Sequence, residues 1–204
     1  YNKPGKAFVG IVSRLDAMTS GVLVLARTSK AASRLTSQFS GRDGSRVQKV
    51  YLAALQGDWN ADQRELTDHV IKDDAAHRMR SVPPTTPGSK EAKLRYFPIA
   101  RNDDATVVAV QLLTGRKHQI RLQFSKRGHP VLGDRKYGAD TAFSHGIALH
   151  SWRLRIQHPT LREMMWFEAP LPRSWKSIRR NMPSAQQILH NIEKAFDLNS
   201  RDSS

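Results

Sequence analysis

The apolar residues of this chain occur in short runs separated by turn-forming residues, and this pattern restricts the folds that are open to it. The longest apolar run covers residues 21–26, whereas a helix that crosses a bilayer needs about 20 apolar residues. We therefore expect no membrane span. Short Val-rich runs are typical of buried strands. Strands are predicted over residues 8–12, 21–26, 47–55, 92–99, 106–113, 147–156 and 164–167.

Helical spacing of apolar residues is found in fewer places. Residues 29–40 show it and are followed by Gly41, a typical stop signal. Further helices are predicted over residues 117–126 and 184–198, and loops over residues 80–90 and 128–134. Because the strands do not alternate regularly with helices, the order favours an α+β fold: a mixed, mainly antiparallel sheet with a few flanking helices.

Positive charge is concentrated in two blocks. The chain has 33 Lys and Arg against 18 Asp and Glu, a net charge of +15. Residues 1–50 and 111–150 are strongly basic, while residues 51–110 are close to neutral. Such blocks predict a groove for a polyanion, so a nucleic acid is the expected partner. The alternative is that the basic residues only keep a small domain in solution.

The familiar signatures of cofactor and metal enzymes do not occur. The sequence has no Gly-rich phosphate loop, no G-x-S-x-G and no H-E-x-x-H motif, and it contains no cysteine. Structural or RNA-contacting roles suit His118 and His150 better than metal ligation does. We therefore expect no metal and no cofactor. A chain without cysteine suits a reducing cytoplasm, which is the expected location.

One acidic residue stands in an unusual position. Asp16, in Ser13-Arg14-Leu15-Asp16, lies between two predicted buried strands and within the first basic block. In an extended backbone Arg14 and Asp16 project to one side and Leu15 to the other. Nearby positive charge keeps a carboxylate ionised, so Asp16 could act as a nucleophile or base. Alternatively, it caps a turn or pairs with Arg14.

A second cluster of basic residues follows a predicted strand. Residues 113–121 read Leu-Thr-Gly-Arg-Lys-His-Gln-Ile-Arg, and Arg116, Lys117 and Arg121 add charge where a helix begins. An anion could bind there. The alternative is an ordinary Thr cap followed by a basic surface helix. Tyr51 completes the set, since it shares a face of the predicted strand 47–55 with Lys49.

Taken together, these motifs resemble those of the RluA-type pseudouridine synthases. Arg14-Leu-Asp16 followed by Thr19-Ser-Gly21 resembles their catalytic motif, and residues 48–53 resemble the strand with their base-contacting tyrosine. Residues 113–121 resemble their third motif. Residues 128–134, 136–138, 149–150 and 158–159 resemble downstream landmarks in the same order, so the resemblance spans residues 12–172.

The sequence also departs from the family pattern. Ser13 stands where the family has His, and Ala17-Met18 replaces an Arg-containing pair, changes that bear on the choice of RNA more than on catalysis. Residues 3–5 match the family's initial Lys-Pro-x-Gly segment poorly. The expected organisation is therefore a catalytic domain over residues 1–183, incomplete at its N-terminus, followed by a C-terminal helix and polar tail over residues 184–204.

The resemblance implies an enzyme that isomerises uridine in RNA, ribosomal RNA first and transfer RNA second, as a monomer without cofactor. It implies that Asp16 is the catalytic acid and that Arg121 forms an ion pair with it. Tyr51 stacks on the uracil, and Arg14 fills the gap left by the flipped base. Arg116 and Lys117 hold phosphates. The alternative is a non-catalytic, basic RNA-binding or ribosome-associated module, which needs no acid at position 16.

Overall fold

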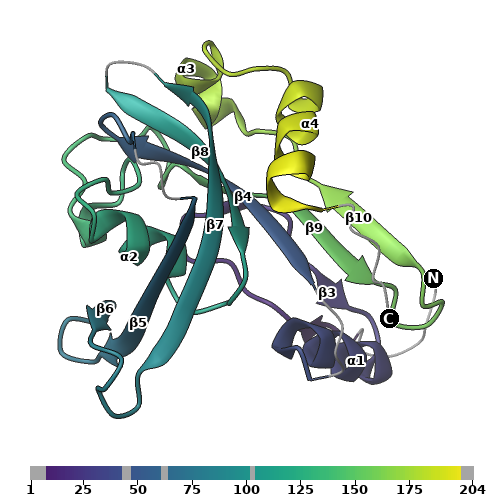
Figure 1. Ribbon diagram of the computed structural model, residues 1–204. Helices are drawn as coiled ribbons and strands as arrows, with labels where there is room; N and C mark the ends of the chain where they lie inside the picture. The colour runs from purple at the N-terminus through teal and green to yellow at the C-terminus, as the bar shows by residue number, and fades with distance from the viewer. Residues whose placement is uncertain (1–7, 43–46, 61–63, 102–103, 199–204) are drawn as a thin grey trace.

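The computed structural model describes residues 8–42, 47–60, 64–101 and 104–198 (Figure 1). Two α-helices of 12 residues, α1 (Ser29–Ser40) and α4 (Ala185–Phe196), and two shorter ones, α2 (Gln119–Ser125) and α3 (Lys176–Arg179), flank the strands. The strands are β1 (Gly10–Ile11), β2 (Ser20–Gly21), β3 (Leu25–Ala26), β4 (Gln48–Gln56), β5 (Glu65–Asp73), β6 (Arg78–Val82), β7 (Lys90–Arg101), β8 (Ala105–Leu112), β9 (Leu149–Gln157) and β10 (Met164–Glu168). Short 3-10 turns cover Arg135–Tyr137 and Arg173–Trp175.

The main sheet has eight strands. Seven of them follow the order β10-β9-β4-β8-β7-β5-β6 and pair antiparallel, and β2 pairs parallel with β9. Strands β1 and β3 form a separate two-stranded sheet. The described chain is thus α+β with a mixed, mainly antiparallel sheet, which confirms the predicted fold class.

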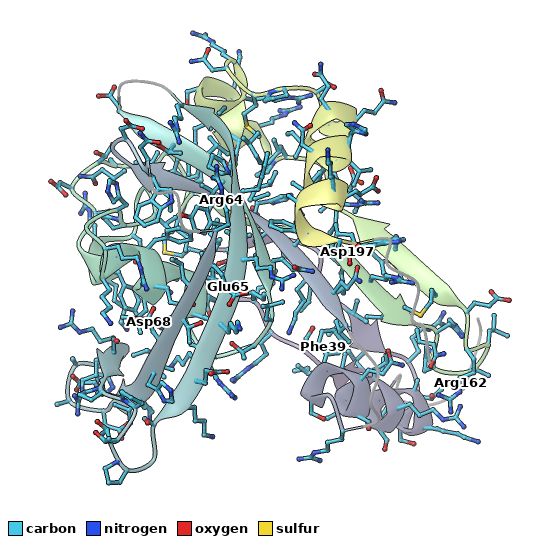
Figure 2. The ribbon with its side chains drawn as sticks, in the orientation of Figure 1. Phe39, Arg64, Glu65, Asp68, Arg162 and Asp197 are labelled. Carbon is cyan, nitrogen blue, oxygen red and sulfur yellow. The ribbon has the colours of Figure 1, made fainter. Side chains whose placement is uncertain are left out.

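The sheet opens into two arms around β4. Pairing between β4 and β8 begins at Val50 opposite Gln111, so the first residues of β4 have no partner in β8. Beyond this point β4, β9 and β10 diverge from β5, β6 and β7 (Figure 1). Figure 2 shows Phe39 of α1 and Glu65 of β5 on the two sides of this opening.

The principal core lies where the two arms join. Its fully buried side chains include Leu52, Leu55, Leu94 and Trp175, and α4 adds Ile192 to the same cluster. Ser184 caps α4 with a capping box, in which its hydroxyl accepts from the Gln187 amide. A smaller core under α1 contains Leu35 and Leu154.

Several predicted elements are confirmed. Helix 29–40 is found as α1, with Gly41 in the left-handed conformation at its end. Strand 47–55 is β4, and the predicted strands 92–99 and 106–113 form the antiparallel pair β7 and β8. The turn between them falls partly on residues 102–103, which lie outside the described residues, as do residues 3–5 and the polar tail from 199.

Other predictions were wrong. Residues 8–12 do not form a buried strand: β1 has two residues, and Phe8, Val9 and Ile11 are 48%, 61% and 71% exposed. The reason is that β1 has only β3 as a strand partner in the described chain, and α1 packs on one side of that pair. The predicted loop 80–90 is shorter, because β6 continues to Val82 and β7 begins at Lys90. Strand β5 was not predicted at all.

Candidate active site

A cleft of about 610 Å³ lies between the arms. Its lining combines residues from the β1–β2 loop, β4, the segment after β8 and β9. Five of the six predicted site residues line it: Arg14, Asp16, Tyr51, Arg116 and Lys117. The sixth, Arg121, lies next to the cleft, with its Nη1 3.9 Å from Oδ2 of Asp16. Leu15, expected on the side opposite to Asp16, also lines the cleft.

The loop that carries Asp16 is fixed at its C-terminal end by β2. The amide of Thr19 donates to the Asp16 carbonyl at 3.1 Å, which closes a turn. Strand β2 then pairs with β9, and the Val22 amide donates to the Ser151 carbonyl at 2.8 Å. Gly21 has a φ of +115°, and a Cβ there would lie 2.1 Å from the Ser151 carbonyl oxygen. Only glycine permits this approach, which holds Asp16 beside β4 and β9.

A buried histidine also supports this loop. The Nε2 of His150 lies 3.1 Å from the Ala169 carbonyl, which can only accept, so this nitrogen carries the proton. The Nδ1 of His150 therefore accepts from the Ser20 hydroxyl at 2.8 Å. Burial lowers the pKa of His150, which favours this neutral form. His150 is thus structural in this fold.

Arg121 is held by a residue that the sequence analysis missed. Its Nε donates to Oδ2 of Asp134 at 2.6 Å and its Nη2 donates to Oδ1 of the same carboxylate at 2.8 Å. The bidentate partner of Arg121 is therefore Asp134 and not Asp16, which has only the longer contact through Nη1. Burial opposes the charged form of Arg121, but the hydrogen bonds and charge of Asp134 outweigh it, and the pKa of Arg121 is raised.

The phenol of Tyr51 lies in the same cleft as Asp16. Burial raises the pKa of Tyr51; a hydrogen bond with the Ser151 side chain opposes this shift, and the charge of Asp16 adds to it. Tyr51 therefore stays protonated well into the alkaline range. A neutral phenol ring next to a carboxylate can stack on a planar group that enters the cleft.

A glutamine side chain shapes the segment between β8 and α2. The Oε1 of Gln119 accepts from the Thr114 hydroxyl at 2.8 Å and from the Arg116 amide at 3.0 Å, while its Nε2 donates to the Lys93 carbonyl. The guanidinium of Arg116 donates to the Glu91 carbonyl. Lys117 is exposed and precedes α2, which is shorter than the predicted helix 117–126. The Thr-Gly-Arg sequence is thus a tethered loop that lines the cleft.

His118 and Tyr137 close the space behind Arg121. The Nδ1 of His118 lies 2.9 Å from the Tyr137 hydroxyl, and the guanidinium of Arg121 lies 4.9 Å from the centre of the Tyr137 ring. Burial lowers the pKa of His118, and the charge of Asp16 opposes that shift. His118 is therefore a buried residue whose hydrogen-bond partner is the side chain of Tyr137.

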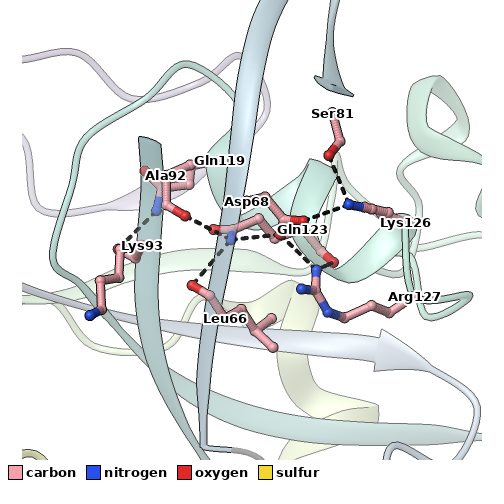
Figure 3. Close-up of polar contacts among 9 residues, drawn as sticks. All are labelled: Leu66, Asp68, Ser81, Ala92, Lys93, Gln119, Gln123, Lys126 and Arg127. Carbon is pink, nitrogen blue, oxygen red and sulfur yellow. Dashed lines mark hydrogen bonds and ion pairs between the residues drawn. The ribbon is translucent and has the colours of Figure 1, made fainter. Parts of the chain in front are cut away.

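The face of α2 opposite to Arg121 is attached to β5 and β7. The Nε2 of Gln123 donates to Oδ2 of Asp68 at 2.9 Å, and Lys126 and Arg127 donate to the same carboxylate at 2.7 and 2.8 Å (Figure 3). Burial would raise the pKa of Asp68, but these hydrogen bonds lower it. This network fixes the helix, so Arg121 on its other side approaches the cleft from a rigid support.

The chemistry open to this arrangement is acid–base or nucleophilic. Among the residues that the structure describes, no group of three or more His, Asp or Glu side chains could hold a metal ion. The cleft offers one carboxylate, a neutral phenol, and cations at its rim.

The described part of the chain contains no helix with the length and apolar character needed to cross a membrane.

Sequence reasoning missed Asp134 and Lys49. Asp134 belongs to a stretch, residues 128–134, that has the composition of a turn, and nothing local links it to a residue 13 positions earlier. Lys49 was placed on the face of Tyr51 without a role, and it lines the cleft. The signal for it was the same alternation along β4 that located Tyr51.

Comparison with known proteins identifies the family. Residues 1–126 match the model of the RNA pseudouridylate synthase family. The chain is 29% identical over 192 residues to ribosomal large subunit pseudouridine synthase C of Vibrio vulnificus, which covers 90% of this chain and 58% of that protein. It is 37% identical over 177 residues to the uncharacterized RNA pseudouridine synthase YjbO of Bacillus subtilis, covering 85% and 59%. The chain therefore spans less than two thirds of these relatives.

A solved structure agrees. Human RNA pseudouridylate synthase domain containing 1 superposes with a TM-score of 0.70 at 26% identity, over 91% of this chain and 80% of that one. The family match covers the loop of Asp16, β4 and all of α2, and most of the residues that line the cleft lie within it. The chain belongs to the RNA pseudouridylate synthase family.

Proposed function

We propose that the protein converts specific uridines in RNA to pseudouridine and that Asp16 carries the reaction. The observation that carries this proposal is the position of Asp16: its side chain is 26% exposed at a basic cleft, 3.9 Å from a guanidinium that is itself fixed by Asp134. A carboxylate so placed is oriented and reachable by a substrate.

The reaction is an isomerisation, so no oxidant, reductant or cofactor is consumed. The C1′–N1 bond of uridine breaks, the uracil turns, a C1′–C5 bond forms, and the proton on C5 is lost while N1 gains one. Asp16 acts at the ribose to promote cleavage of the glycosidic bond. Tyr51, which lines the same cleft, stacks on the uracil and takes part in moving the C5 proton. The uridine must leave its stack to reach these groups, and Arg14 fills the gap.

Arg116 and Lys117 hold phosphates at the rim of the cleft. Arg121 is a positioning residue, because its two hydrogen bonds go to Asp134 and only its third nitrogen faces Asp16. Ribosomal RNA is the first expected substrate and transfer RNA the second. The names of several relatives, which are ribosomal large subunit enzymes, favour this order. We place the protein in the cytoplasm, as a monomer.

The test is conversion of uridine in unmodified transcripts of large-subunit ribosomal RNA, small-subunit ribosomal RNA and transfer RNA. After incubation, each RNA is digested to nucleosides and pseudouridine is measured by chromatography. We expect conversion in one transcript and none with Asp16→Asn. Binding without conversion in all three transcripts would favour the non-catalytic RNA-binding module instead.

A further inference from the structure

A second cavity, of about 900 Å³, meets the active-site cleft where the arms of the sheet diverge. We call it the rear groove. Phe196 and Asp197 at the end of α4 line it but do not line the cleft, whereas Phe39 of α1 lines both cavities (Asp197 and Phe39 are labelled in Figure 2). Lys49, Gly115 and Arg116 line both cavities and therefore stand at the boundary between them.

Lys49 occupies this junction without an anionic partner. Within the described chain its ammonium makes no ion pair and no hydrogen bond, although burial lowers the pKa of Lys49. A Cβ added at Gly115 would lie 3.3 Å from Nζ of Lys49, so the absent side chain leaves the ammonium room beside the loop. A cation that is desolvated but not paired costs free energy, and an anion bound at the junction would offset that cost.

The rear groove also contains unpaired amide groups. Gln111 is 8% exposed, and its Oε1 accepts no hydrogen bond in the described part of the chain. The Oε1 of Gln48, on the neighbouring strand, also accepts no hydrogen bond in the described part of the chain. Side-chain amides with free hydrogen-bonding capacity can pair with the edge of an unstacked base. Three cations, Lys49, Arg95 and Arg116, outnumber the one carboxylate among the described residues of this lining, Asp197. Arg95 is also paired with Glu65.

We propose that the rear groove binds the unpaired nucleotide next to the target uridine, with Lys49 holding the phosphate between the two nucleotides and Gln48 and Gln111 facing the neighbouring base. This inference rests on the proposed function. It explains why a lysine without a partner stands between two cavities and why glycine occupies position 115. It also gives the enzyme a means of distinguishing uridines by the base beside them.

The test compares three variants by binding to a short single-stranded oligouridylate at about 50 and 200 mM salt. Lys49→Met removes the charge on a strand that tolerates methionine. Gly115→Ala keeps the charge but places a methyl group against the ammonium. Gln111→Leu removes the amide from β8. Lys72→Met is the matched control, since Lys72 is exposed on β5 and paired with Asp74. Melting curves establish that each variant is folded.

We expect Lys49→Met to weaken binding and to reduce the slope of log affinity against log salt by about 0.7, the value for one phosphate on a single strand. Gly115→Ala should weaken binding in the same direction and to a smaller extent, because the ammonium can shift away from the added methyl group. Lys49→Gln, which also removes the charge, replaces Lys49→Met if that variant does not fold. Gln111→Leu should weaken binding about fivefold or more with an unchanged salt slope, because a base contact releases no counterion. Lys72→Met should change neither quantity.

An unchanged affinity and salt slope in both Lys49→Met and Gly115→Ala would overturn the proposal; the rear groove would then be a site for something other than RNA, such as a peptide. This outcome is separate from failure of the proposed function. If the wild-type protein converts no transcript yet the variants bind as expected, the proposed catalytic function is refuted and nucleotide binding in the rear groove is supported. If conversion is normal and the variants bind like the wild type, only the proposal of nucleotide binding in the rear groove is refuted.

Discussion

The carboxylate of Asp134 holds the guanidinium of Arg121 through two hydrogen bonds of 2.6 and 2.8 Å, and this leaves the third nitrogen of Arg121 3.9 Å from Asp16. The two partners are 7% and 1% exposed in their side chains. The pair is therefore a rigid, buried support, and Asp16 is oriented by a cation that is itself oriented. Arg121 therefore positions Asp16, whereas Arg116 and Lys117 only contribute charge.

Arg121→Lys tests this separation. Lysine keeps the charge but cannot form the planar fork with Asp134, so the cation beside Asp16 loses its fixed position. We expect turnover at saturating RNA to fall by about 100-fold, the cost of a misplacement near 1 Å at a reacting group. RNA affinity and its salt dependence should change little. Asp134→Asn should reduce turnover in the same direction, because it removes the charge that orders the guanidinium.

Lys117→Ala is the control for that prediction. Lys117 is exposed at the rim of the cleft and contacts neither carboxylate in the described structure. Its removal should weaken RNA binding modestly and reduce the salt slope, with turnover at saturation nearly unchanged. If Arg121→Lys and Lys117→Ala affected binding alone and to the same extent, Arg121 would be one more phosphate contact.

Asp16→Asn should abolish pseudouridine formation. Asparagine keeps the shape and most hydrogen bonds of the side chain but removes the charge that the chemistry needs. RNA affinity should stay within a few fold of the wild-type value, because phosphate contacts dominate affinity. Parallel measurement of product and of binding by a filter assay checks both statements. Substantial turnover by this variant would exclude Asp16 as the catalytic acid.

Tyr51→Leu should remove most of the activity while the fold survives. The ring lines the cleft, and leucine is acceptable in the middle of a strand such as β4. Tyr51→Phe, which keeps the ring, separates stacking from the hydroxyl: retained activity would assign Tyr51 to stacking alone. A large fall in melting temperature with normal turnover per folded molecule would instead show that Tyr51 serves the core, which it also contacts.

Strand β5 illustrates what local sequence could not reveal. Its inward positions are Leu66, Asp68 and Val70, and the charged residue in the middle breaks the apolar alternation that marks a strand. Asp68 is tolerated there because Lys126 and Arg127 of a distant segment neutralise it. That compensation exists only in the folded molecule. Helix α1 was predictable for the opposite reason, since its Thr28 cap, its apolar stripe and Gly41 are all local.

The candidate site likewise contains residues that the sequence could predict and one that it could not. Asp16, Tyr51 and the residues from Arg116 to Arg121 could be selected from motifs along the chain, and the structure brings them together at one cleft. Asp134 could not be selected, because its role depends on a contact with α2 that no spacing encodes. The expected ion pair of Arg121 with Asp16 is present as a contact of 3.9 Å, because a second carboxylate, that of Asp134, takes the two hydrogen bonds of the guanidinium.

Acidification should destabilise the protein through His150. Burial holds the pKa of His150 in the folded state below the ordinary value of about 6.5, so the unfolded chain binds more protons in this range. The stabilising contribution is complete above about pH 6.5 and is lost as the pH falls towards the folded-state value. His118, whose pKa burial also lowers, acts with the same sign.

The measurement is the melting temperature between about pH 7 and pH 5. His150→Gln should reduce the change in melting temperature over this interval, since glutamine can accept from Ser20 and donate to Ala169 but cannot titrate. His190→Gln, at an exposed position of α4, is the control and should leave the change as in the wild type. Equal pH dependence in wild type and His150→Gln would show that His150 does not titrate in this range.

Gly21→Ala should be among the most damaging substitutions in the chain although it adds one methyl group. Two separate effects oppose it. The φ of +115° is unfavourable for any residue with a Cβ, and that Cβ would lie 2.1 Å from the Ser151 carbonyl oxygen, an atom of the backbone that cannot turn aside. Gly88→Ala separates the effects, because Gly88 has a φ of +76° but nothing within 4 Å of a Cβ.

For Gly88→Ala we expect a loss of about 1–2 kcal/mol of stability, the cost of left-handed backbone for an L-residue, and normal turnover. Gly21→Ala must also separate β2 from β9, which releases the hydrogen bond from Val22 to Ser151 and the loop of Asp16 with it. Its loss of stability should therefore clearly exceed that of Gly88→Ala, and turnover should fall even at temperatures where the variant is folded. Chemical denaturation of both variants, with turnover measured beside it, gives the comparison. Equal losses of stability with normal turnover in both would mean that the contact between β2 and β9 does not position Asp16.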